Sequence, residues 1–342
     1  MERILIGRDS EVLIGRGMPA EILPGSDTRT RTAIISQPGA AQIAEEVAVA
    51  IEGEGCPTHL KVFGDGDAIK TLATAGTTYE WLADLGIGRH DTIVGVGGGA
   101  VTDFAGFIAG TWLRGIEAVY VSTTLLGAVD AAIGGKTGLN LRGKNLVGLF
   151  GHPARVVIDI EVLDALPEEL LSEGFAEAVK AGFIADPKLV ELIARDGLAA
   201  DLEQVVSRAV AVKGEVVAGD FREAGRRGVL NYGHTIGHGI EMAAGISHGR
   251  AVSIGMVAAG AVSEARLGFA GAARQKDILG GLGLPVVAPA VDVAEVRRLI
   301  GLDKKHDSFG LRMALLEDFG KAHLQHVTSD DITLGLAAIG LT

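Results

Sequence analysis

The periodicity of the sequence changes near residue 160, and this change constrains the fold more than any other feature. Before it, short apolar and β-branched runs alternate with helical patterns. The strand-like runs are 32–36, 60–63, 92–96, 118–122 and 156–159, and the helical ones reach to about 51 and then cover 71–85 and 102–109. Strands separated by helices are typical of a parallel, doubly wound sheet. We therefore expect an α/β domain over residues 1–160.

The second half of the chain has a helical pattern. Pro167 precedes a series of segments with helical periodicity, which are 168–186, 188–195, 200–219, 230–244, 249–267 and 272–281. No convincing strand interrupts them before the C-terminal region. We expect residues 161–342 to form an all-α domain.

Composition and net charge limit the partners and the compartment that the protein can have. The 342 residues carry a net charge of -12, which argues against nucleic acid or an anionic membrane surface as the main partner. Cys56 is the one cysteine, so no internal disulfide framework can form, which fits a reducing compartment. The first residues lack a signal-peptide pattern, and no apolar run approaches the ~20 residues that span a bilayer. We expect a cytoplasmic protein.

Three of the nine histidines fall within 15 residues, from His234 to His248. His234 and His238 are four residues apart, so on a helix they share one face. Imidazole is a common neutral metal ligand, and two rings with a remote third group would form a divalent-metal site. The alternative is a pair of helix histidines, one capping and one packed.

A glycine-rich turn, Gly95-Val-Gly-Gly-Gly-Ala100, follows a strand and begins a helix. Glycine there lets backbone N–H groups approach a pyrophosphate, whose charge the helix N-terminus favours. The acidic ribose ligand that usually ends the next strand is missing, because that strand ends in Ser122-Thr-Thr124. A dinucleotide would therefore bind in a variant manner, and the alternative is a purely structural turn.

Two lysines, Lys136 and Lys144, each follow a glycine in a stretch with little acid except Asp130. On glycine-rich loops of an acidic protein, lysines resemble anion ligands, with ordinary surface charge as the alternative. The segment is not a P-loop, because position 131 is alanine.

The segment Glu173-Gly-Phe-Ala-Glu-Ala-Val-Lys180 places Glu177 and Lys180 three residues apart on a small, apolar helix. One interpretation makes Glu177 the carboxylate that completes a metal site with His234 and His248. One carboxylate and two imidazoles, with positions left open, are typical of a catalytic metal site. The alternative is a solvated helix face with an ion pair.

These segments together resemble the 3-dehydroquinate synthase family, within the wider sugar-phosphate cyclases, from about residue 60 to 320. The matching blocks are 97–103, 111–115, 122–126, 129–138, 143–148, 174–180, 231–238, 248–249 and 303–305. The resemblance implies an N-terminal Rossmann-like, NAD-binding α/β domain (1–160) and an all-α, metal- and substrate-binding domain (161–342).

The resemblance also implies site residues. Glu177, His234 and His248 would hold Zn²⁺, for which Co²⁺ can substitute. The residues implied around the substrate are Asp130, Lys136, Lys144, Asn145, Lys180, Lys213, Arg227, Asn231, His238, and one or both of Lys304 and Lys305. Those implied at NAD are Asp65, Gly66, Asp67, Lys70, Gly99, Ala100, Val101, Thr102, Asp103, Thr123, Thr124, Lys136, Lys144, Val162, Leu163, Asp164 and Ala165. Arg114 would reach the phosphate of a neighbouring subunit, which implies a homodimer.

The implied activity converts 3-deoxy-D-arabino-heptulosonate 7-phosphate to 3-dehydroquinate and phosphate in the shikimate pathway. It proceeds by transient oxidation with NAD, phosphate elimination, re-reduction and an intramolecular aldol closure, so the enzyme is a carbon–oxygen lyase. Alternatives are relatives that form amino-dehydroquinate, inosose or valiolone-type rings, a metal-dependent polyol or alcohol dehydrogenase, and a degenerate NAD- or metal-binding regulator.

The chain departs from the family pattern at three positions. Gln37 stands near the place of an aspartate that holds the adenosine ribose, Asp67 replaces a glutamate, and Arg250 replaces a glutamate that commonly follows the third metal ligand. The first two concern the NAD site, and the third changes the charge near the metal.

Overall fold

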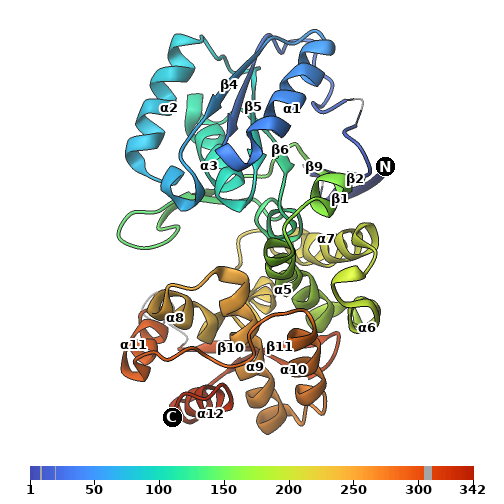
Figure 1. The fold of residues 1–342 in the computed structure, drawn as a ribbon. Coiled ribbons are helices and arrows are strands. Elements are labelled where there is room, and N and C mark those ends of the chain that lie inside the picture. The colour runs from blue at the N-terminus through green and yellow to red at the C-terminus, as the bar shows by residue number, and fades with distance from the viewer. Residues whose placement is uncertain (8–9, 20, 304–309) are drawn as a thin grey trace. The chain divides into compact units, whose positions relative to one another are not determined.

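The structure is a computed structural model that describes residues 1–7, 10–19, 21–303 and 310–342. It divides into two compact units, Met1–Leu166 and Pro167–Thr342, coloured blue to green and green to red in Figure 1. The division falls after α4 (Ile160–Asp164) rather than at 160. The reason is that α4 follows directly on strand β9, and its Asp164 pairs with Arg16 of the first unit at 2.8 Å.

The first unit is built on a seven-stranded sheet with the order β1-β2-β9-β6-β5-β3-β4. The strands are β1 (Glu2–Ile6), β2 (Ser10–Gly15), β3 (Thr32–Ser36), β4 (Thr58–Val62), β5 (Thr92–Gly97), β6 (Glu117–Ser122) and β9 (Arg155–Asp159). All neighbouring strands are parallel except the edge pair β1–β2. The predicted parallel sheet is confirmed, and the edge pair is an addition to the predicted strands.

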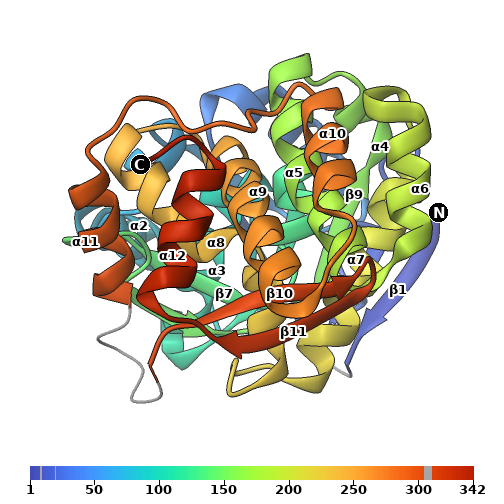
Figure 2. The same ribbon diagram turned by 90° about the horizontal axis from the view of Figure 1, so that it is seen from below.

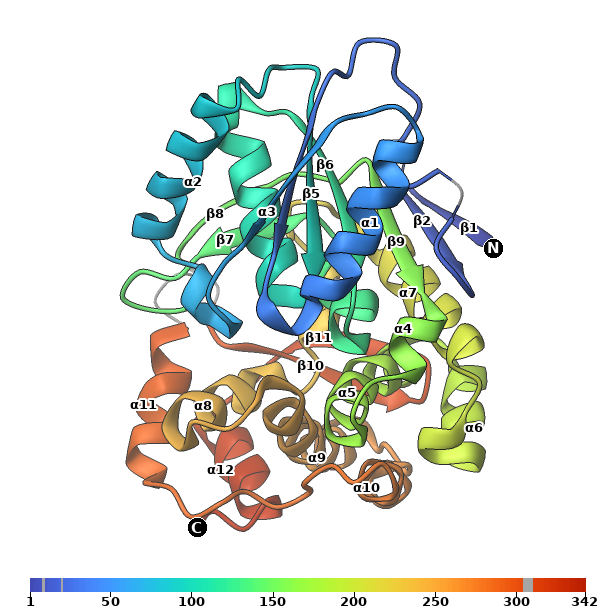
Figure 3. The same cartoon turned by 45° about the horizontal axis from the view of Figure 1, so that its top comes forward.

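Helices α1 (Ala41–Gly53), α2 (Leu72–Asp84) and α3 (Gly99–Thr111) connect these strands, and Figure 3 shows α1 running across the sheet. α1 and α3 both contact the sheet. Strand and helix side chains share one apolar core, which includes Ile34, Val47, Val94, Val119 and Val157. Burial of such β-branched residues on both faces explains why these strands are continuous apolar runs in the sequence.

The segment after β6 forms a π-helix at Gly127–Ala131 and then a small antiparallel hairpin of β7 (Lys136–Leu139) and β8 (Val147–Phe150). The hairpin packs against α3. It places the predicted anion-binding lysines at the start of β7 and in the loop between β7 and β8.

The second unit is helical. Its helices are α5 (Glu168–Ala185), α6 (Pro187–Asp196), α7 (Leu202–Gly219), α8 (His234–Ala244), α9 (His248–Leu267), α10 (Ala272–Gly281), α11 (Val293–Asp303) and α12 (Ser329–Ala338). α9 is buried over most of its length, and it contacts α5, α8, α10 and α12. A helix that is apolar on all sides is a core helix, so α9 is the centre of this unit.

One antiparallel hairpin, β10 (Arg312–Asp318) with β11 (Lys321–His326), adds to the helices of the second unit, and β10 lies along α9 (Figure 2). The predicted combination of an α/β half and a helical half is confirmed, with this hairpin as the exception to a purely helical second unit. Among the described residues, no helix combines the length and the apolar character needed to cross a bilayer.

Candidate functional site

Three helices of the second unit bring Glu177, His234 and His248 together. Glu177 Oε1 lies 3.6 Å from His234 Nε2 and 3.7 Å from His248 Nε2. One potential ligand atom from each residue lies within 4.8 Å of the other two. Ligand atoms of a tetrahedral site with bonds of about 2.1 Å are about 3.4 Å apart, so the spacing fits one cation bound by all three side chains.

Close helix packing explains how these distant residues meet. A Cβ atom on Gly249 would lie 2.4 Å from the Glu173 carbonyl oxygen, and one on Gly255 would lie 1.9 Å from the Gly233 carbonyl oxygen. Larger residues would therefore separate α9 from α5 and from the start of α8. Gly233 has φ of +82°, which favours glycine, and it directly precedes His234. Glycine thus sets the spacing of the three helices that carry the cluster.

Glu177 is buried, and its two oxygens have different surroundings. Oε2 forms an ion pair with the Lys180 ammonium, which is also buried, whereas Oε1 has no hydrogen-bond partner among the described residues. Burial is the largest effect on the pKa of Glu177 and raises it, but Lys180 and His248 together hold the pKa well below its usual range. An ionised, buried oxygen that faces two imidazole nitrogens is a suitable cation ligand. The burial also shows that the solvated-face alternative is wrong for Glu177 and Lys180.

Both imidazole rings have a partner on the nitrogen that faces away from Glu177. His234 Nδ1 lies 3.2 Å from the Tyr232 carbonyl oxygen, and His248 Nδ1 lies 3.0 Å from Glu241 Oε2. Burial, the largest effect, lowers the pKa of His248, but Glu177 and Glu241 outweigh it and raise the pKa to about 10. The alternative of one capping and one packed histidine does not account for His234, whose Nε2 faces the carboxylate.

His238 completes a group of three rings, with centroids 5.0 Å from His234 and 5.8 Å from His248. It also belongs to a second potential ligand group with Glu241 and His248. Glu241 is absent from the predicted site residues. Its signal in the sequence is its position seven residues after His234, which places it on the histidine face of α8.

The loop before α8 carries further predicted residues. Asp220 accepts hydrogen bonds from the backbone of Ala224, Gly225 and Arg227, which fixes the loop. Arg227 in this loop is buried, as is Lys213 on α7, and Asn231 donates to Glu223 at 3.0 Å. Glu223 has φ of +57°, uncommon for a residue with a side chain, and the sequence gives no pattern that would single it out.

In the first unit, the glycine-rich turn joins β5 to α3. A Cβ atom on Gly97 would lie 2.5 Å from Val101 Cγ2, and one on Gly99 would lie 2.9 Å from the Ala131 side chain. The turn therefore has a packing reason for glycine. No side chain of the described residues caps the N-terminus of this 13-residue helix, which suits a phosphate group. Val101 and Thr102 are buried in this first turn, and Ala100 lies beside them.

Five predicted residues form one polar cluster in this unit. Lys70 is buried and contacts both Asp103, at 2.6 Å, and Asn145. Asp67 lies 3.9 Å from the Lys144 ammonium. Burial, the largest effect, raises the pKa of Asp103 to about 6, although the Lys70 ammonium opposes it. Asn145 has φ of +55°, so the turn presents it in a strained conformation.

The remaining predicted NAD residues lie at nearby turns or in the core of the first unit. Thr124 Oγ1 accepts from the Gly127 amide at 3.1 Å, and Thr123 is buried. Gln37 donates to the carbonyl oxygens of Gly64, at 2.9 Å, and Gly66, at 2.7 Å, so it fixes the segment that contains Asp65. The segment 162–165 forms the end of α4, where the Leu163 side chain is fully buried.

Other predicted residues are exposed or undescribed. Lys136, Lys144 and Arg114 are exposed, and Asp130 is half-buried in the π-helix. Arg114 has φ of +71° in the turn after α3. Lys304 and Lys305 lie outside the described residues.

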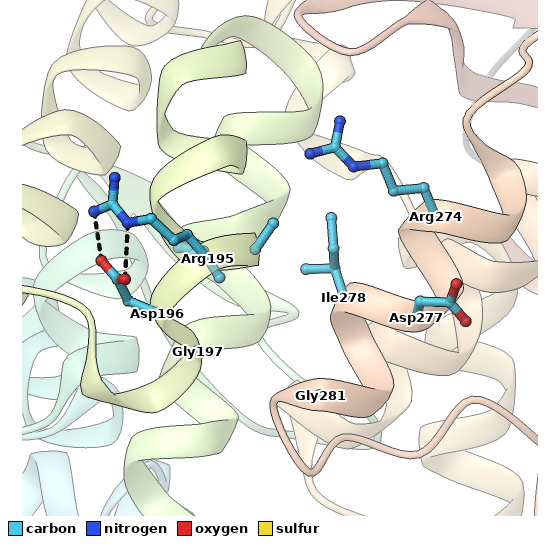
Figure 4. A pocket seen from close by; sticks show the side chains of 9 residues that line it. Arg195, Asp196, Gly197, Arg274, Asp277, Ile278 and Gly281 are labelled. Atoms are coloured by element: carbon cyan, nitrogen blue, oxygen red, sulfur yellow. Dashed lines mark hydrogen bonds and ion pairs between the residues drawn. The ribbon is translucent and has the colours of Figure 1, made fainter.

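A separate cavity of about 540 Å³ lies between the end of α6 and α10 in the second unit (Figure 4). Its two arginines pair with neighbouring acids, Arg195 with Asp196 and Arg274 with Glu191. None of the predicted site residues that the structure describes lines it. We therefore assign no chemistry to this cavity.

Solved structures with the same fold define the class of protein. A 2-deoxy-scyllo-inosose synthase complexed with carbaglucose-6-phosphate, NAD⁺ and Co²⁺ is 28% identical, with a TM-score of 0.87 over 100% of both chains. ValA, a 2-epi-5-epi-valiolone synthase from Streptomyces hygroscopicus subsp. jinggangensis 5008 with NAD⁺ and Zn²⁺ bound, is 26% identical, with a TM-score of 0.88 over 98% of both chains. An iron-containing alcohol dehydrogenase shares only the fold, at 15% identity and a TM-score of 0.67 over 98% of both chains. The fold is that of the sugar-phosphate cyclases.

Sequence comparison identifies the family within this class. Residues 60–173 match the family described as 3-dehydroquinate synthase N-terminal, and residues 174–306 match 3-dehydroquinate synthase C-terminal. The 3-dehydroquinate synthase of Corynebacterium jeikeium (strain K411) is 41% identical over 340 residues, which cover 94% of this chain and 91% of that protein. The chain belongs to the 3-dehydroquinate synthase family, as its resemblance indicates.

Proposed function

We propose that the protein is a 3-dehydroquinate synthase, a phosphate-eliminating lyase that forms 3-dehydroquinate from 3-deoxy-D-arabino-heptulosonate 7-phosphate. The observation that carries this proposal is the Glu177, His234 and His248 cluster beside buried Lys180, in a chain 41% identical to a 3-dehydroquinate synthase over nearly its full length. We place the enzyme in the cytoplasm and in the shikimate pathway.

The residues present fit a divalent cation and NAD. Glu177 Oε1 and two Nε2 atoms provide one carboxylate and two imidazoles, a set that Zn²⁺ and Co²⁺ accept and that leaves positions open for substrate oxygens. The turn at Gly97–Gly99 and the polar cluster of Asp67, Lys70 and Asp103 would hold NAD. When bound, NAD⁺ would supply a reversible hydride acceptor and the cation a Lewis acid for the reacting oxygen.

Lys180 has two roles in this proposal. Its ammonium pairs with Glu177 Oε2, which keeps the carboxylate ionised as a ligand. Because the group is buried, its positive charge acts in a low-dielectric environment and stabilises negative charge on an oxygen more than a surface lysine would.

The other cations would bind the substrate's anionic groups. Lys213 and Arg227 are buried in the second unit, and Lys136 and Lys144 are exposed on the β7–β8 hairpin of the first unit. Charge-assisted hydrogen bonds to a carboxylate or a phosphate provide orientation as well as affinity. Asp130, Asn145, Asn231 and His238 would contact substrate hydroxyls, and we assign Lys304 and Lys305 the same anion-binding role.

We also propose that the enzyme is a homodimer in which Arg114 reaches the substrate phosphate of the neighbouring subunit. The support is the exposed guanidinium and the positive φ at Leu113 and Arg114, which fix an unusual turn at this residue. Mixing inactive Arg114→Ala and Glu177→Gln subunits should restore activity, because one site of the mixed dimer would contain both native residues. Inactive mixed dimers would contradict action across the interface.

One assay tests the proposed reaction against its alternatives. Purified protein with NAD⁺, Zn²⁺ and the heptulosonate phosphate should release phosphate and form 3-dehydroquinate, identified by NMR. No stoichiometric reduced nicotinamide should accumulate, because the hydride returns to the product. Stoichiometric NADH would identify a dehydrogenase instead. Turnover of an amino analogue or a hexose phosphate in preference to the heptulosonate would identify a related cyclase.

A further inference from the structure

Glu241 contacts a proposed metal ligand, His248, at the ring nitrogen that faces away from Glu177. It is buried, and its Oε2 lies 3.0 Å from Nδ1 of His248. Residues 234, 238 and 241 occupy one face of α8. The same helix face therefore provides one proposed ligand, His234, and the carboxylate that contacts another, His248 on α9.

Once a cation has replaced the proton on Nε2, these contacts select one form of each imidazole. A carbonyl oxygen only accepts hydrogen bonds, so the Tyr232 contact places a proton on Nδ1 of His234. An ionised carboxylate also only accepts, so Glu241 places a proton on Nδ1 of His248. In both rings Nε2 is then the atom that a cation takes, and both Nε2 atoms face Glu177 Oε1.

The two contacts differ in charge. The contact to His234 comes from a neutral backbone carbonyl, whereas the contact to His248 comes from a carboxylate. A carboxylate on the remote nitrogen orients the ring and makes the ligating nitrogen more basic. His248 is also the more exposed ring, with 27% of its side chain accessible against 10% for His234, so packing restrains it less.

We propose that Glu241 is a positioning residue that sets the cation affinity of this site through His248 without contacting the ion. The inference rests on the proposed metal site of Glu177, His234 and His248. Glu241 also belongs to the potential ligand group with His238 and His248. We favour a role for Glu241 outside the ligand set because its Oε2 is already bonded to Nδ1 of His248, whereas Oε1 of Glu177 has no hydrogen-bond partner in the part of the chain that the structure describes.

The test is a Zn²⁺ competition titration with a fluorescent chelator, without substrate or NAD. Glu241→Gln should raise the Kd for Zn²⁺ about 10-fold, and Glu241→Ala up to about 100-fold. The matched control is Glu173→Gln, because Glu173 accepts from the hydroxyl of Ser247, the residue before His248, rather than from a ligand ring. The control should change the Kd by less than about threefold, since Gln keeps the acceptor.

Two outcomes of the titration would overturn the proposal. A wild-type Kd in both Glu241 variants would show that the contact does not set the affinity. Loss of binding as complete as in Glu177→Gln would make Glu241 a ligand rather than a positioning residue. The titration does not depend on turnover, so a protein that binds Zn²⁺ through Glu177 but releases no phosphate would refute the proposed reaction and leave this inference standing.

A spectroscopic measurement on the wild-type protein removes any dependence on the folding of the variants. In ¹⁵N NMR spectra of the Zn²⁺-loaded protein, His248 should be metal-bound at Nε2 and protonated at Nδ1. Coordination through Nδ1 would contradict the proposal. In Glu241→Gln, the Nδ1 signal of His248 should shift while that of His234 stays, because the carbonyl that contacts His234 is unchanged.

Discussion

The substitution Gly249→Ala should weaken cation binding and fold stability together. Gly249 follows the proposed ligand His248, and an added Cβ would lie 2.4 Å from the Glu173 carbonyl oxygen, one helical turn before Glu177. Real Cβ atoms keep at least 3.0 Å, so the contact is 0.6 Å too short and involves backbone that cannot rotate away. The start of α9 and α5 must therefore separate by about 0.6 Å, taking His248 away from Glu177.

The expected changes in the Kd for Zn²⁺ and in the unfolding free energy can each be worked out from the size of the close contact. Ligand distances in metal sites are defined to about 0.2 Å, so a shift about three times larger should raise the Kd for Zn²⁺ at least about 10-fold, or ~1.4 kcal/mol. Overpacking costs ~1–3 kcal/mol of unfolding free energy, from which at most ~1 kcal/mol of better helix propensity is recovered. With the full gain recovered, the net loss of unfolding free energy should be ~0–2 kcal/mol.

The assays are urea unfolding in the presence of a chelator and the Zn²⁺ competition titration. Gly280→Ala in α10 is the matched control, since no heavy atom of the described residues lies within 4 Å of the added Cβ. It should leave the Kd unchanged and gain up to ~1 kcal/mol of unfolding free energy. If Gly249→Ala behaves like Gly280→Ala in both assays, close packing at residue 249 does not set the ligand geometry.

Three further substitutions test other parts of the structure. Glu177→Gln should abolish metal-dependent turnover, and retained activity would remove Glu177 from the site. With chelator present, the same substitution should lower the unfolding free energy by ~3 kcal/mol, because buried Lys180 loses its counter-charge. The Asp91 carboxylate accepts from backbone amides 2.7–2.9 Å away, and these bonds hold its pKa below the usual 3.8 although burial, the largest effect, raises it. The ionised form of Asp91 therefore stabilises the fold above pH ~4, and this stabilisation decreases as the pH falls. Asp91→Asn should lower the free energy of unfolding, measured in urea, by ~2 kcal/mol at pH 7 and by clearly less near pH 3. An equal loss at both pH values would refute this prediction. Lys136→Ala should raise KM for the heptulosonate phosphate at least about 10-fold, with exposed Lys188→Ala as an unaffected control, and equal KM values would remove Lys136 from substrate binding.

Local sequence patterns identified most elements of the fold. The strands β3, β5, β6 and β9 are continuous apolar runs because both sheet faces are covered, and such runs are visible without knowledge of their partners. The strands β1 and β7 gave no such signal. β1 is an exposed edge strand, and β7 contains a glycine and begins with an exposed lysine, so their pairing depends on partners rather than on their own composition.

The sequence alone determined the residue types of the candidate site and one local relation, the shared helix face of His234 and His238. The family resemblance implied that Glu177 joins His234 and His248, but no periodicity relates positions 57 and 71 residues apart, so only the tertiary structure shows the three side chains together. It also showed that Glu177 and Lys180 are buried, which no i,i+3 pattern distinguishes from a solvated ion pair. The contact of Glu241 with His248 likewise depends on how α8 packs on α9. Glycine allows the two helices to pack closely, but helix periodicity does not specify which residues then meet.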